Sequence, residues 1–485
     1  MTLAATAACG GSGDDTAADS TVTIGATAEP STLDLTTTSV AAIPQVLLYN
    51  VYETLVKVDE TGKVVPLLAE RYDLSKDRKT YTFTLHSGVT FGNGKELTPD
   101  DVVFSLDRVR AKDSKHPFKA QMAPVESVEA KGDDQVVVTL SRPSNAWLYD
   151  MTSSTGAILD EDAVGDLATK PVGTGPYTMQ RWSRGTSITL QRNEKYWGDK
   201  PSVATVVFRY FDDPNAMNNA MLADDLDIIS NVQAPQTLKQ FDDTSRFTVT
   251  EGTTNGEVVL GMNDSRGPLK DERVRRAITH AIDREALVKT VWAGHGKLLG
   301  SMVPPTDPWY EDLADTHPYD PAKARRLLKE AGQENLKLTM KLPTLPYATA
   351  SGQFIAAQLK KVGIECDVSE LEFPARWIDV VFTQADYDLS IVSHVEPRDI
   401  VQYGNADYYW RYDDARVRSW LAAADRGTPE QQVTYMRRVA ERISTDAASG
   451  WLFLLPNLIV AKKGVTGYPR NAVSLSFEVA KLKKV

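Results

Sequence analysis

Apolar and polar residues alternate with a period of two along much of the first half of the chain, a pattern typical of half-buried strands. Residues 21–26 give the first example, with valine and isoleucine at alternate positions. Three segments have a helical pattern instead, and one of them begins with Thr98 and Pro99, a favoured pair at a helix start. These expected helices are residues 45–55, 98–109 and 213–222, and the further strands are residues 71–84, 134–140, 177–182, 187–192, 203–210, 226–229 and 258–263.

In the second half, longer helical patterns alternate with short apolar strands. One helix opens at Asp320 and Pro321 and ends at Gly332, which matches the preferences for an N-cap, a first-turn proline and a terminal glycine. The alternation of helix and strand predicts an open sheet with flanking helices. The expected helices are residues 273–292, 320–332, 351–362 and 429–447, and the strands are residues 336–342, 364–371, 387–393 and 452–460.

The length and charge of the chain limit its architecture and its partners. At 485 residues the chain exceeds what one hydrophobic core usually serves, so two or more lobes are expected. The net charge of −11 argues against nucleic acid as a partner, because phosphate binding needs a basic surface. After the N-terminus, no apolar run approaches the roughly 20 residues that span a bilayer.

The densest cluster of glycine and proline lies in residues 170–201. Pro171, Gly173, Gly175 and Pro176 precede the strand at residues 177–182, and glycine and proline at this density fix a turn and exclude a helix. A second strand follows after Arg184 and Gly185. This segment therefore predicts a well-specified hairpin.

The same segment is the first of four ordered matches to a known family. Its PVGTGPY and LQRNEKYW motifs resemble those of the peptide/nickel-type extracellular solute-binding proteins, solute-binding family five, which are the binding subunits of ABC importers. The other matches are YETL at residues 52–55 through PLLAE at 66–70, FGNGKELTPDDV at residues 91–102, and residues 271–286 with the core RRAITHAIDREA. Together they cover most of the chain after about residue 22.

The resemblance implies a bilobed α/β fold of the periplasmic-binding-protein type (type II, Venus-flytrap), with an extra α+β domain inserted in the first lobe. We expect residues 1–20 to be a signal remnant and flexible tether. The first lobe would comprise residues 21–50, 168–262 and 452–485, the inserted domain residues 51–167, and the second lobe residues 263–451. One crossover between the lobes is expected at Met262 and Asn263.

The implied function is capture of a peptide-like or other small polar solute between the lobes and its delivery to a membrane permease driven by a separate ATPase. A monomer is expected, without a cofactor and without nucleic acid. The alternatives are a binder of a nickel or metallophore chelate with the same fold, a secreted hydrolase, and a receptor component that senses its ligand.

No catalytic signature supports the hydrolase. The six histidines form no HExxH motif and no pair at metal-ligand spacing, and there is no GxSxG elbow. Gly294-His-Gly296-Lys297 is followed by leucine, which excludes a P-loop. We therefore expect a protein that is not an enzyme.

The most unusual polar stretch is residues 390–412, SIVSHVEPRDIVQYGNADYYWRY. It leaves an apolar strand, and ligands in open α/β sheets bind at strand ends. Aromatic residues with a few charges suit a binding cleft, although a surface loop with internal ion pairs is the alternative. The candidate ligand-binding residues here are His394, Glu396, Arg398, Asp399, Tyr403 and Trp410.

The resemblance gives these residues specific roles. In peptide-binding members the equivalent segment supplies an aspartate that pairs with the α-amino group of the peptide, but the Gly-Trp…Asp-x-Pro-Asp pattern is absent here. Glu396 or Asp399 could still take an ammonium, and Arg398 could take a carboxylate. His394 could bind a metal held in an organic chelate, and no other metal ligand is expected.

Six further residues are weaker candidates for the cleft wall. They lie after the first strand, on the first expected helix, before the presumed crossover and before the strand at residues 387–393, and for each one packing or turn formation is an equal alternative. These residues are Glu29, Thr32, Tyr49, Asn50, Asn255 and Trp377.

The two cysteines lie in different contexts. Small residues precede Cys9, and a Gly/Ser/Asp run follows it, which resembles the end of a bacterial lipoprotein signal. Cys9 is therefore expected to be lipidated and to anchor the protein to the outer face of the cytoplasmic membrane, although the charged and apolar parts of such a signal are missing. Cys366 is expected to be a buried apolar residue.

Overall fold

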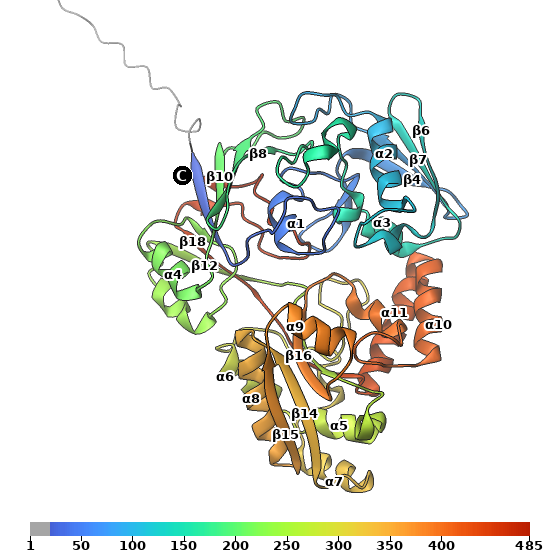
Figure 1. The fold of residues 1–485 in the computed structure, drawn as a ribbon, viewed down its shortest axis with the longest axis vertical. Coiled ribbons are helices and arrows are strands. Elements are labelled where there is room, and N and C mark those ends of the chain that lie inside the picture. The colour runs from blue at the N-terminus through green and yellow to red at the C-terminus, as the bar shows by residue number, and fades with distance from the viewer. Residues whose placement is uncertain (1–19) are drawn as a thin grey trace, which may run out of the picture.

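The computed structural model describes residues 20–485 of this mixed α/β protein, which forms two lobes (Figure 1). The predicted lipidation site Cys9 lies outside the described residues. Within residues 20–485, no helix combines the length and hydropathy needed to cross a membrane.

The first lobe contains a seven-stranded sheet with the order β12-β18-β11-β1-β10-β9-β8. Its central strand β1 (Thr21–Ala26) runs parallel to both of its neighbours, β10 and β11, and buries Val22 and Ile24 completely. The sheet therefore joins segments from both ends of the chain. The remaining elements are α1 (Ala42–Leu47), β8 (Tyr177–Ser183), β9 (Ser187–Arg192), β10 (Thr205–Tyr210), α4 (Pro214–Leu222), β11 (Ile228–Ile229), β12 (Phe247–Gly252), β18 (Asn457–Lys462), β19 (Val465–Thr466) and β20 (Lys483–Lys484).

The inserted α+β domain contains a four-stranded antiparallel sheet with the order β4-β5-β7-β6. The alternating segment at residues 71–84 is two strands, because the Ser75 hydroxyl accepts from the Thr80 N–H and Arg78 has a φ of 59°, which together form a turn. We did not predict β6. The elements are β2 (Val56–Val58), β3 (Val64–Pro66), β4 (Ala69–Leu74), β5 (Thr80–Leu85), α2 (Pro99–Arg110), β6 (Val125–Lys131), β7 (Gln135–Leu140) and α3 (Asn145–Asp150).

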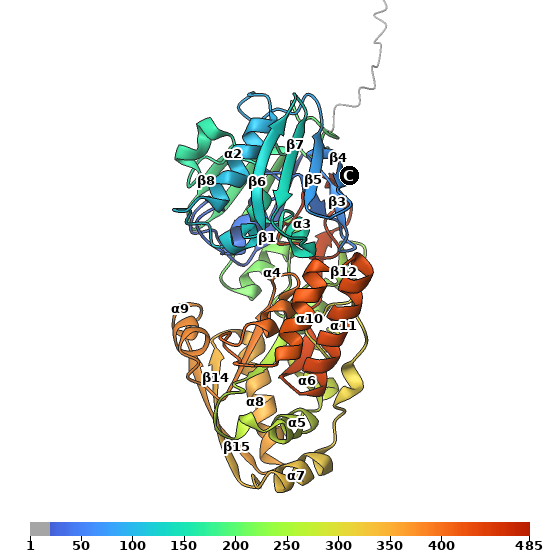
Figure 2. The ribbon, with the colours of Figure 1, turned by 90° about the vertical axis from the view of Figure 1, so that its right-hand side faces the viewer.

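The second lobe contains a five-stranded sheet with the order β15-β14-β16-β13-β17. Helices α10 and α11 form an antiparallel pair that extends from this lobe toward α3 of the inserted domain (Figures 1 and 2). The elements are β13 (Glu257–Met262), α5 (Glu272–His280), α6 (Arg284–Val291), α7 (Pro321–Glu330), β14 (Leu336–Pro343), α8 (Pro346–Lys360), β15 (Ile364–Leu371), α9 (Ala375–Trp377), β16 (Leu389–His394), α10 (Ala415–Arg426), α11 (Pro429–Thr445) and β17 (Ser449–Leu454).

The chain passes between the two large sheets earlier than we predicted. Strand β13 is hydrogen-bonded to β16 and β17 of the second lobe, so the crossover precedes Glu257 and does not lie at Met262 and Asn263. The return differs in the same way, because residues 452–460 are not one strand. They contain the end of β17 and the start of β18, and Leu455 and Pro456 connect the two sheets.

Three predicted helices also have different limits. The helix expected at residues 351–362 begins earlier, because α8 spans Pro346–Lys360. The helix expected at residues 45–55 ends at Leu47, because Tyr49 has a left-handed φ of 60° and the Tyr52 N–H closes a turn on the Leu47 carbonyl. The pattern at residues 273–292 is two helices, α5 and α6. Asp283 separates them by capping α6, since its carboxylate accepts from the Ala286 N–H.

A buried carboxylate connects three of the sequence motifs by hydrogen bonds. Glu53 accepts hydrogen bonds from the Thr174 hydroxyl (2.8 Å), the Tyr196 hydroxyl (2.7 Å) and the Trp197 indole N–H (2.9 Å). The residue is 1% exposed, and burial raises its pKa to about 7 against the effect of the three donors. The YETL, GTGPY and NEKYW motifs thus meet at one side chain, which attaches the inserted domain to the first lobe.

Candidate functional site

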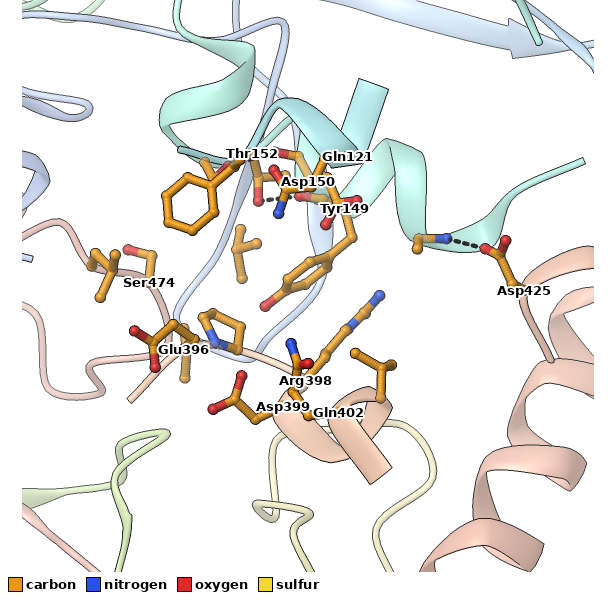
Figure 3. Close-up of a pocket in the computed structure, with 18 of the residues that line it drawn as sticks. Gln121, Tyr149, Asp150, Thr152, Glu396, Arg398, Asp399, Gln402, Asp425 and Ser474 are labelled. Carbon is orange, nitrogen blue, oxygen red and sulfur yellow. Dashed lines mark hydrogen bonds between the residues drawn. The ribbon is translucent and has the colours of Figure 1, made fainter. Parts of the chain in front are cut away.

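A cavity of about 360 Å³ lies where the second lobe faces the inserted domain (Figure 3). This volume is within the range of small-molecule sites. The second lobe provides Trp309, Glu396, Arg398, Asp399, Val401 and Gln402; the inserted domain provides Phe118, Gln121, Tyr149, Asp150 and Thr152; the first lobe adds Leu48 and residues 473–475.

The loop that follows β16 carries the charged side chains of the cavity. The strand ends at His394, and Arg398 adopts a left-handed φ of 63° before a short 3-10 helix, Asp399–Gly404. A left-handed conformation is uncommon for arginine and is held only where the surroundings impose it. The loop thereby directs Glu396, Arg398 and Asp399 toward the cavity (Figure 3).

Aromatic rings from both sides of the cavity position the Arg398 guanidinium. Its central carbon lies 3.5 Å from the centre of the Tyr149 ring and 4.9 Å from that of Trp309. These are cation–π distances. Within residues 20–485, the buried Nε of Arg398 has no hydrogen-bond partner.

Two carboxyl groups beside Arg398 have raised pKa values. Burial raises the pKa of Asp150 to about 7 and that of Asp307 to about 6, and the positive charge of Arg398 opposes both shifts. Neither group is hydrogen-bonded to Arg398, so their interaction with it is purely electrostatic. The donors of the guanidinium thus remain free to bind an anion from the cavity.

His394 orients Asp399 from behind the cavity wall. Its Nδ1 lies 3.1 Å from Oδ2 of Asp399, and its Nε2 lies 3.0 Å from the Tyr409 hydroxyl. With the proton on Nδ1, His394 donates to the carboxylate and Tyr409 donates to Nε2, which satisfies all three groups. Burial raises the pKa of Asp399 to about 6, against the effect of His394.

His394, Glu396 and Asp399 are also the best metal-ligand set among the described residues. One ligand atom of each lies within 4.8 Å of the other two. An imidazole with two carboxylates suits a divalent transition metal. In the present arrangement, however, both nitrogens of His394 are already hydrogen-bonded.

A further carboxylate, Glu257, lies beside this cluster. It is 2% exposed and pairs with His394 across strands β13 and β16, so both side chains point to the same face of the sheet. Its Oε2 has no hydrogen-bond partner within residues 20–485. Burial raises its pKa well above the ordinary value, and the negative charge of Asp399 adds to the shift.

Three of the predicted site residues belong to an aromatic core instead of the cavity wall. Tyr403 stacks on Trp410 with ring centres 4.2 Å apart and donates to the Ser449 hydroxyl. Trp377 is 4% exposed and donates its indole N–H to Ser390. Their side chains pack in the second lobe below the loop, because large aromatic rings gain most from complete burial.

The weaker candidates are also placed away from the cavity. Glu29 accepts from the Trp182 indole and from the Gly185 N–H, Thr32 accepts from the Asp34 N–H, and Asn50 bridges the backbone of residues 46, 477 and 479. Tyr49 and Asn255 lie directly behind the wall, where they donate to the carbonyls of its residues Thr152 and Val473. The first three have structural contacts, and the last two support the wall.

Several wall residues were not predicted, Tyr149, Asp150 and Trp309 above all. Tyr149 and Asp150 end α3, a helix that Ser144 caps by accepting from the Trp147 N–H. Ser144-Asn145-Ala146-Trp147 is a recognisable helix start, but nothing local indicates that this helix faces the other lobe. Trp309 lies in a proline-rich loop without a periodic pattern.

Comparison with known proteins identifies the class. Residues 63–414 match the family model for bacterial extracellular solute-binding proteins, family 5 (middle region), so the chain belongs to this family. The dipeptide-binding protein of Escherichia coli (strain K12) is 30% identical over 347 residues, which cover 64% of this chain and 64% of that protein.

The glutathione-binding protein GsiB of Pectobacterium atrosepticum is 26% identical over 470 residues, 91% of this chain and 90% of that protein. Among solved structures, NikA from Brucella suis in complex with Fe(III)-EDTA superposes with a TM-score of 0.85 at 23% identity, over 96% of this chain and 100% of that chain. The predicted bilobed type II fold and the predicted family are thus confirmed. The relatives are named as binding proteins, not as enzymes.

Proposed function

We propose that this protein is the extracytoplasmic solute-binding subunit of an ABC importer and that it captures a small polar solute in the cavity between its lobes. The observation that carries this proposal is the free Arg398 guanidinium, held between rings of two domains at the wall of the cavity. The family match and the dipeptide- and glutathione-binding relatives support a peptide-like solute.

We propose that the two crossovers act as the hinge. They lie side by side, because the Leu455 N–H donates to the Gly256 carbonyl (2.8 Å) and the Thr254 hydroxyl donates to the Leu455 carbonyl (2.6 Å). Two adjacent connections allow rotation of one lobe against the other. A solute that contacts both lobes stabilises the closed state through its higher affinity for that state.

The partners follow from the family and remain part of the proposal. A permease would receive the solute from the closed form, and a separate ATPase would drive transport. The protein would act as a monomer, held at the outer face of the cytoplasmic membrane through a lipid on Cys9. Labelling with a radioactive fatty acid, lost in Cys9→Ala, tests the anchor.

A metal chelate is the second candidate solute. His394, Glu396 and Asp399 carry this alternative, and NikA from Brucella suis, in complex with Fe(III)-EDTA, has the same fold. An uncharged or purely apolar solute is not expected at a wall with this many charges.

Thermal unfolding of the full chain against a library of peptides, metal chelates, amino-acid conjugates and sugars tests the proposal. A solute that binds only the folded state adds about 2.7 kcal/mol of stability at a hundredfold excess over its dissociation constant. We expect a dose-dependent rise in the midpoint that Arg398→Ala abolishes. Turnover of a library compound, or a shift that Arg398→Ala leaves intact, contradicts the proposal.

A further inference from the structure

The charged side chains that line the cavity are mostly acidic. Among the described residues, the wall contains four carboxyl groups and one cation, Arg398. One of the four, Asp425, pairs with Arg142, which lies outside the wall. The other three form no ion pair with a lysine or an arginine of residues 20–485; they are Asp150, Glu396 and Asp399. When these groups are ionised, the wall therefore has more negative than positive charge.

The three unpaired carboxyl groups come from two different parts of the molecule. Asp150 ends α3 of the inserted domain, whereas Glu396 and Asp399 belong to the loop after β16. Figure 3 shows Asp150 beside Tyr149, across the cavity from this loop, and it shows Arg398 directed to the other side of the loop from the two carboxylates. Like charges repel more strongly where little water separates them, so closure of the cleft around an empty cavity is opposed by this arrangement.

The protein itself compensates the carboxylates of the loop only weakly. Glu396 is exposed, and Asp399 has only the imidazole of His394 as a partner of possible positive charge. Behind them, Glu257 is 2% exposed, and its Oε2 has no hydrogen-bond partner among the described residues. The negative charges of Asp399, Asp307 and Glu396 all raise the pKa of Glu257, so the electrostatic potential on this side of the cavity is negative.

Asp150 lacks a partner as well. The positive charge of Arg398 acts on it without a hydrogen bond, and burial still raises its pKa to about 7. The other polar side chains of the wall are uncharged amides and hydroxyls, whose oxygens also accept from a cationic donor: Gln121, Thr152, Ser153, Ser154, Gln402, Gln432 and Ser474. Buried carboxylates are stable when a cation compensates them, and a bound cation supplies this compensation on both sides of the cavity.

We infer that the solute carries a net positive charge, as does a peptide with a lysine or arginine side chain, and that its cationic groups bind between Asp150 of the inserted domain and the Glu396 and Asp399 carboxylates of the second lobe. This inference rests on the proposed function and makes it narrower. Arg398 leaves room for one carboxylate on such a solute, but a dipeptide without a basic side chain brings too little positive charge.

Four dipeptides with the same backbone test the inference by calorimetric titration of the full chain. Alanyl-lysine has a basic side chain, alanyl-Nε-acetyl-lysine and alanyl-norleucine have neutral ones, and alanyl-glutamate has an acidic one. The titrations are made at pH 7.5, above the raised pKa values of Asp150 and Asp399. We expect alanyl-lysine to bind about tenfold or more tightly than each neutral dipeptide, and alanyl-glutamate to bind most weakly.

Amide variants assign this preference to the carboxylates. Asp150→Asn and Glu396→Gln keep the shape of each side chain, and each should reduce the ratio of the alanyl-lysine to the alanyl-norleucine affinity by about threefold or more. The double variant should abolish the preference. Asp413→Asn is the matched control, because it removes an exposed acid of the second lobe that pairs with Arg418 outside the cavity, and it should leave the ratio unchanged.

Several results overturn the inference without affecting the proposed function. They are equal or tighter binding of a neutral dipeptide or of alanyl-glutamate, and a preference for alanyl-lysine that the double variant retains. Binding of Ni²⁺ alone, lost in His394→Ala and competitive with alanyl-lysine, assigns the acidic loop to a metal instead. If none of the four dipeptides binds, a library ligand without net positive charge overturns this inference only, a cationic library ligand supports it, and the absence of any library ligand contradicts both proposals.

Discussion

Glu53 gives three separate motifs a common partner. Its buried carboxylate accepts from Thr174, which is also buried, and from the half-buried Tyr196 and Trp197. An unsatisfied buried donor costs about 1–3 kcal/mol. Glu53 prevents this cost in full for Thr174 and satisfies two partly buried donors as well. The contribution of Glu53 to stability is therefore larger than that of a typical surface acid.

We predict that Glu53→Ala lowers the free energy of unfolding by about 3 kcal/mol or more, because one buried and two partly buried donors lose their acceptor and a cavity forms. Urea unfolding followed by tryptophan fluorescence measures the loss. Glu194→Ala is the control, since Glu194 forms exposed ion pairs with Arg192 and Lys200 that contribute at most about 1 kcal/mol. Similar losses in the two variants would contradict the assigned role of Glu53.

Two histidines join three elements at the base of the second lobe. His280 is the last residue of α5, and its Nδ1 lies 2.6 Å from the carbonyl oxygen of Pro318. The Nε2 of His317 lies 2.9 Å from the carbonyl oxygen of Ser444 in α11. Their ring centres are 5.1 Å apart. Burial lowers the pKa of both, to about 4 for His317, and the nearby Arg276 and Lys323 add to the shift.

This pair predicts a loss of stability in acid. Between pH 6.5 and about 4 the unfolded chain takes up protons that the folded protein does not, so the free energy of unfolding falls as the pH falls, by about 2–3 kcal/mol for His317. His317→Gln keeps a donor for Ser444 and should show a shallower decline in thermal midpoint across this window. Above pH 7.5 the slopes of the two proteins should coincide, and equal slopes below pH 6.5 would exclude the histidine as the cause.

The limits of the elements depend on contacts that the local sequence does not contain. The apolar alternation of β17 and β18 continues through Leu455, so residues 452–460 resemble one strand although the two parts belong to different sheets. Likewise, the apolar face that predicts a helix at residues 45–55 continues past α1 because Val51 and Tyr52 are buried in a turn. Periodicity reports burial, and burial persists where the backbone changes direction.

The site was predictable only on the side formed by one continuous loop. Glu396, Arg398 and Asp399 follow an apolar strand, and the strand-end rule predicts their position. Tyr149 faces them from a segment almost 250 residues earlier, and only the packing of the inserted domain against the second lobe brings its ring centre within 3.5 Å of the Arg398 guanidinium carbon. Tyr403 and Trp410 belong to the same stretch as the loop, but composition cannot distinguish a ring that faces a ligand from one that faces the core.

At the scale of the whole molecule, the end of α10 in the second lobe contacts the start of α3 in the inserted domain. Asp425, near the end of α10, accepts from the Ser144 hydroxyl (2.7 Å) and from the Ala146 N–H (3.1 Å) at the start of α3, and pairs with Arg142. In return, the Asn145 amide donates to the carbonyls of Ala424 and Gly427. Acid at a helix start and donors at a helix end are favourable arrangements, here formed between lobes.

We predict that Asp425→Ala weakens solute binding although Asp425 is already neutralised by Arg142. Opening of the lobes would break these contacts. Removing them therefore destabilises the closed state relative to the open state by about 1–2 kcal/mol, which corresponds to a five- to thirtyfold rise in Kd. Stopped-flow measurement should assign the change to faster solute release. Asp413→Ala, which removes an exposed ion pair with Arg418 of the same helix, should leave Kd unchanged; an equal effect of both variants would contradict the role of the junction.

The position of this junction has a consequence for which solutes are accepted. The cavity wall extends from Asp425 and Ala146 at the helix junction to Val473, which Asn255 contacts at the crossover. The length of the cavity is therefore fixed by the crossover at one end and by the contact between α3 and α10 at the other. A solute that exceeds this length can still bind to the charged loop, but it would hold α3 away from α10 and prevent the two lobes from closing fully. Under the proposed function, binding and full closure would then be two separate requirements, and a permease that accepts only the closed form would reject an oversized solute even when it is tightly bound.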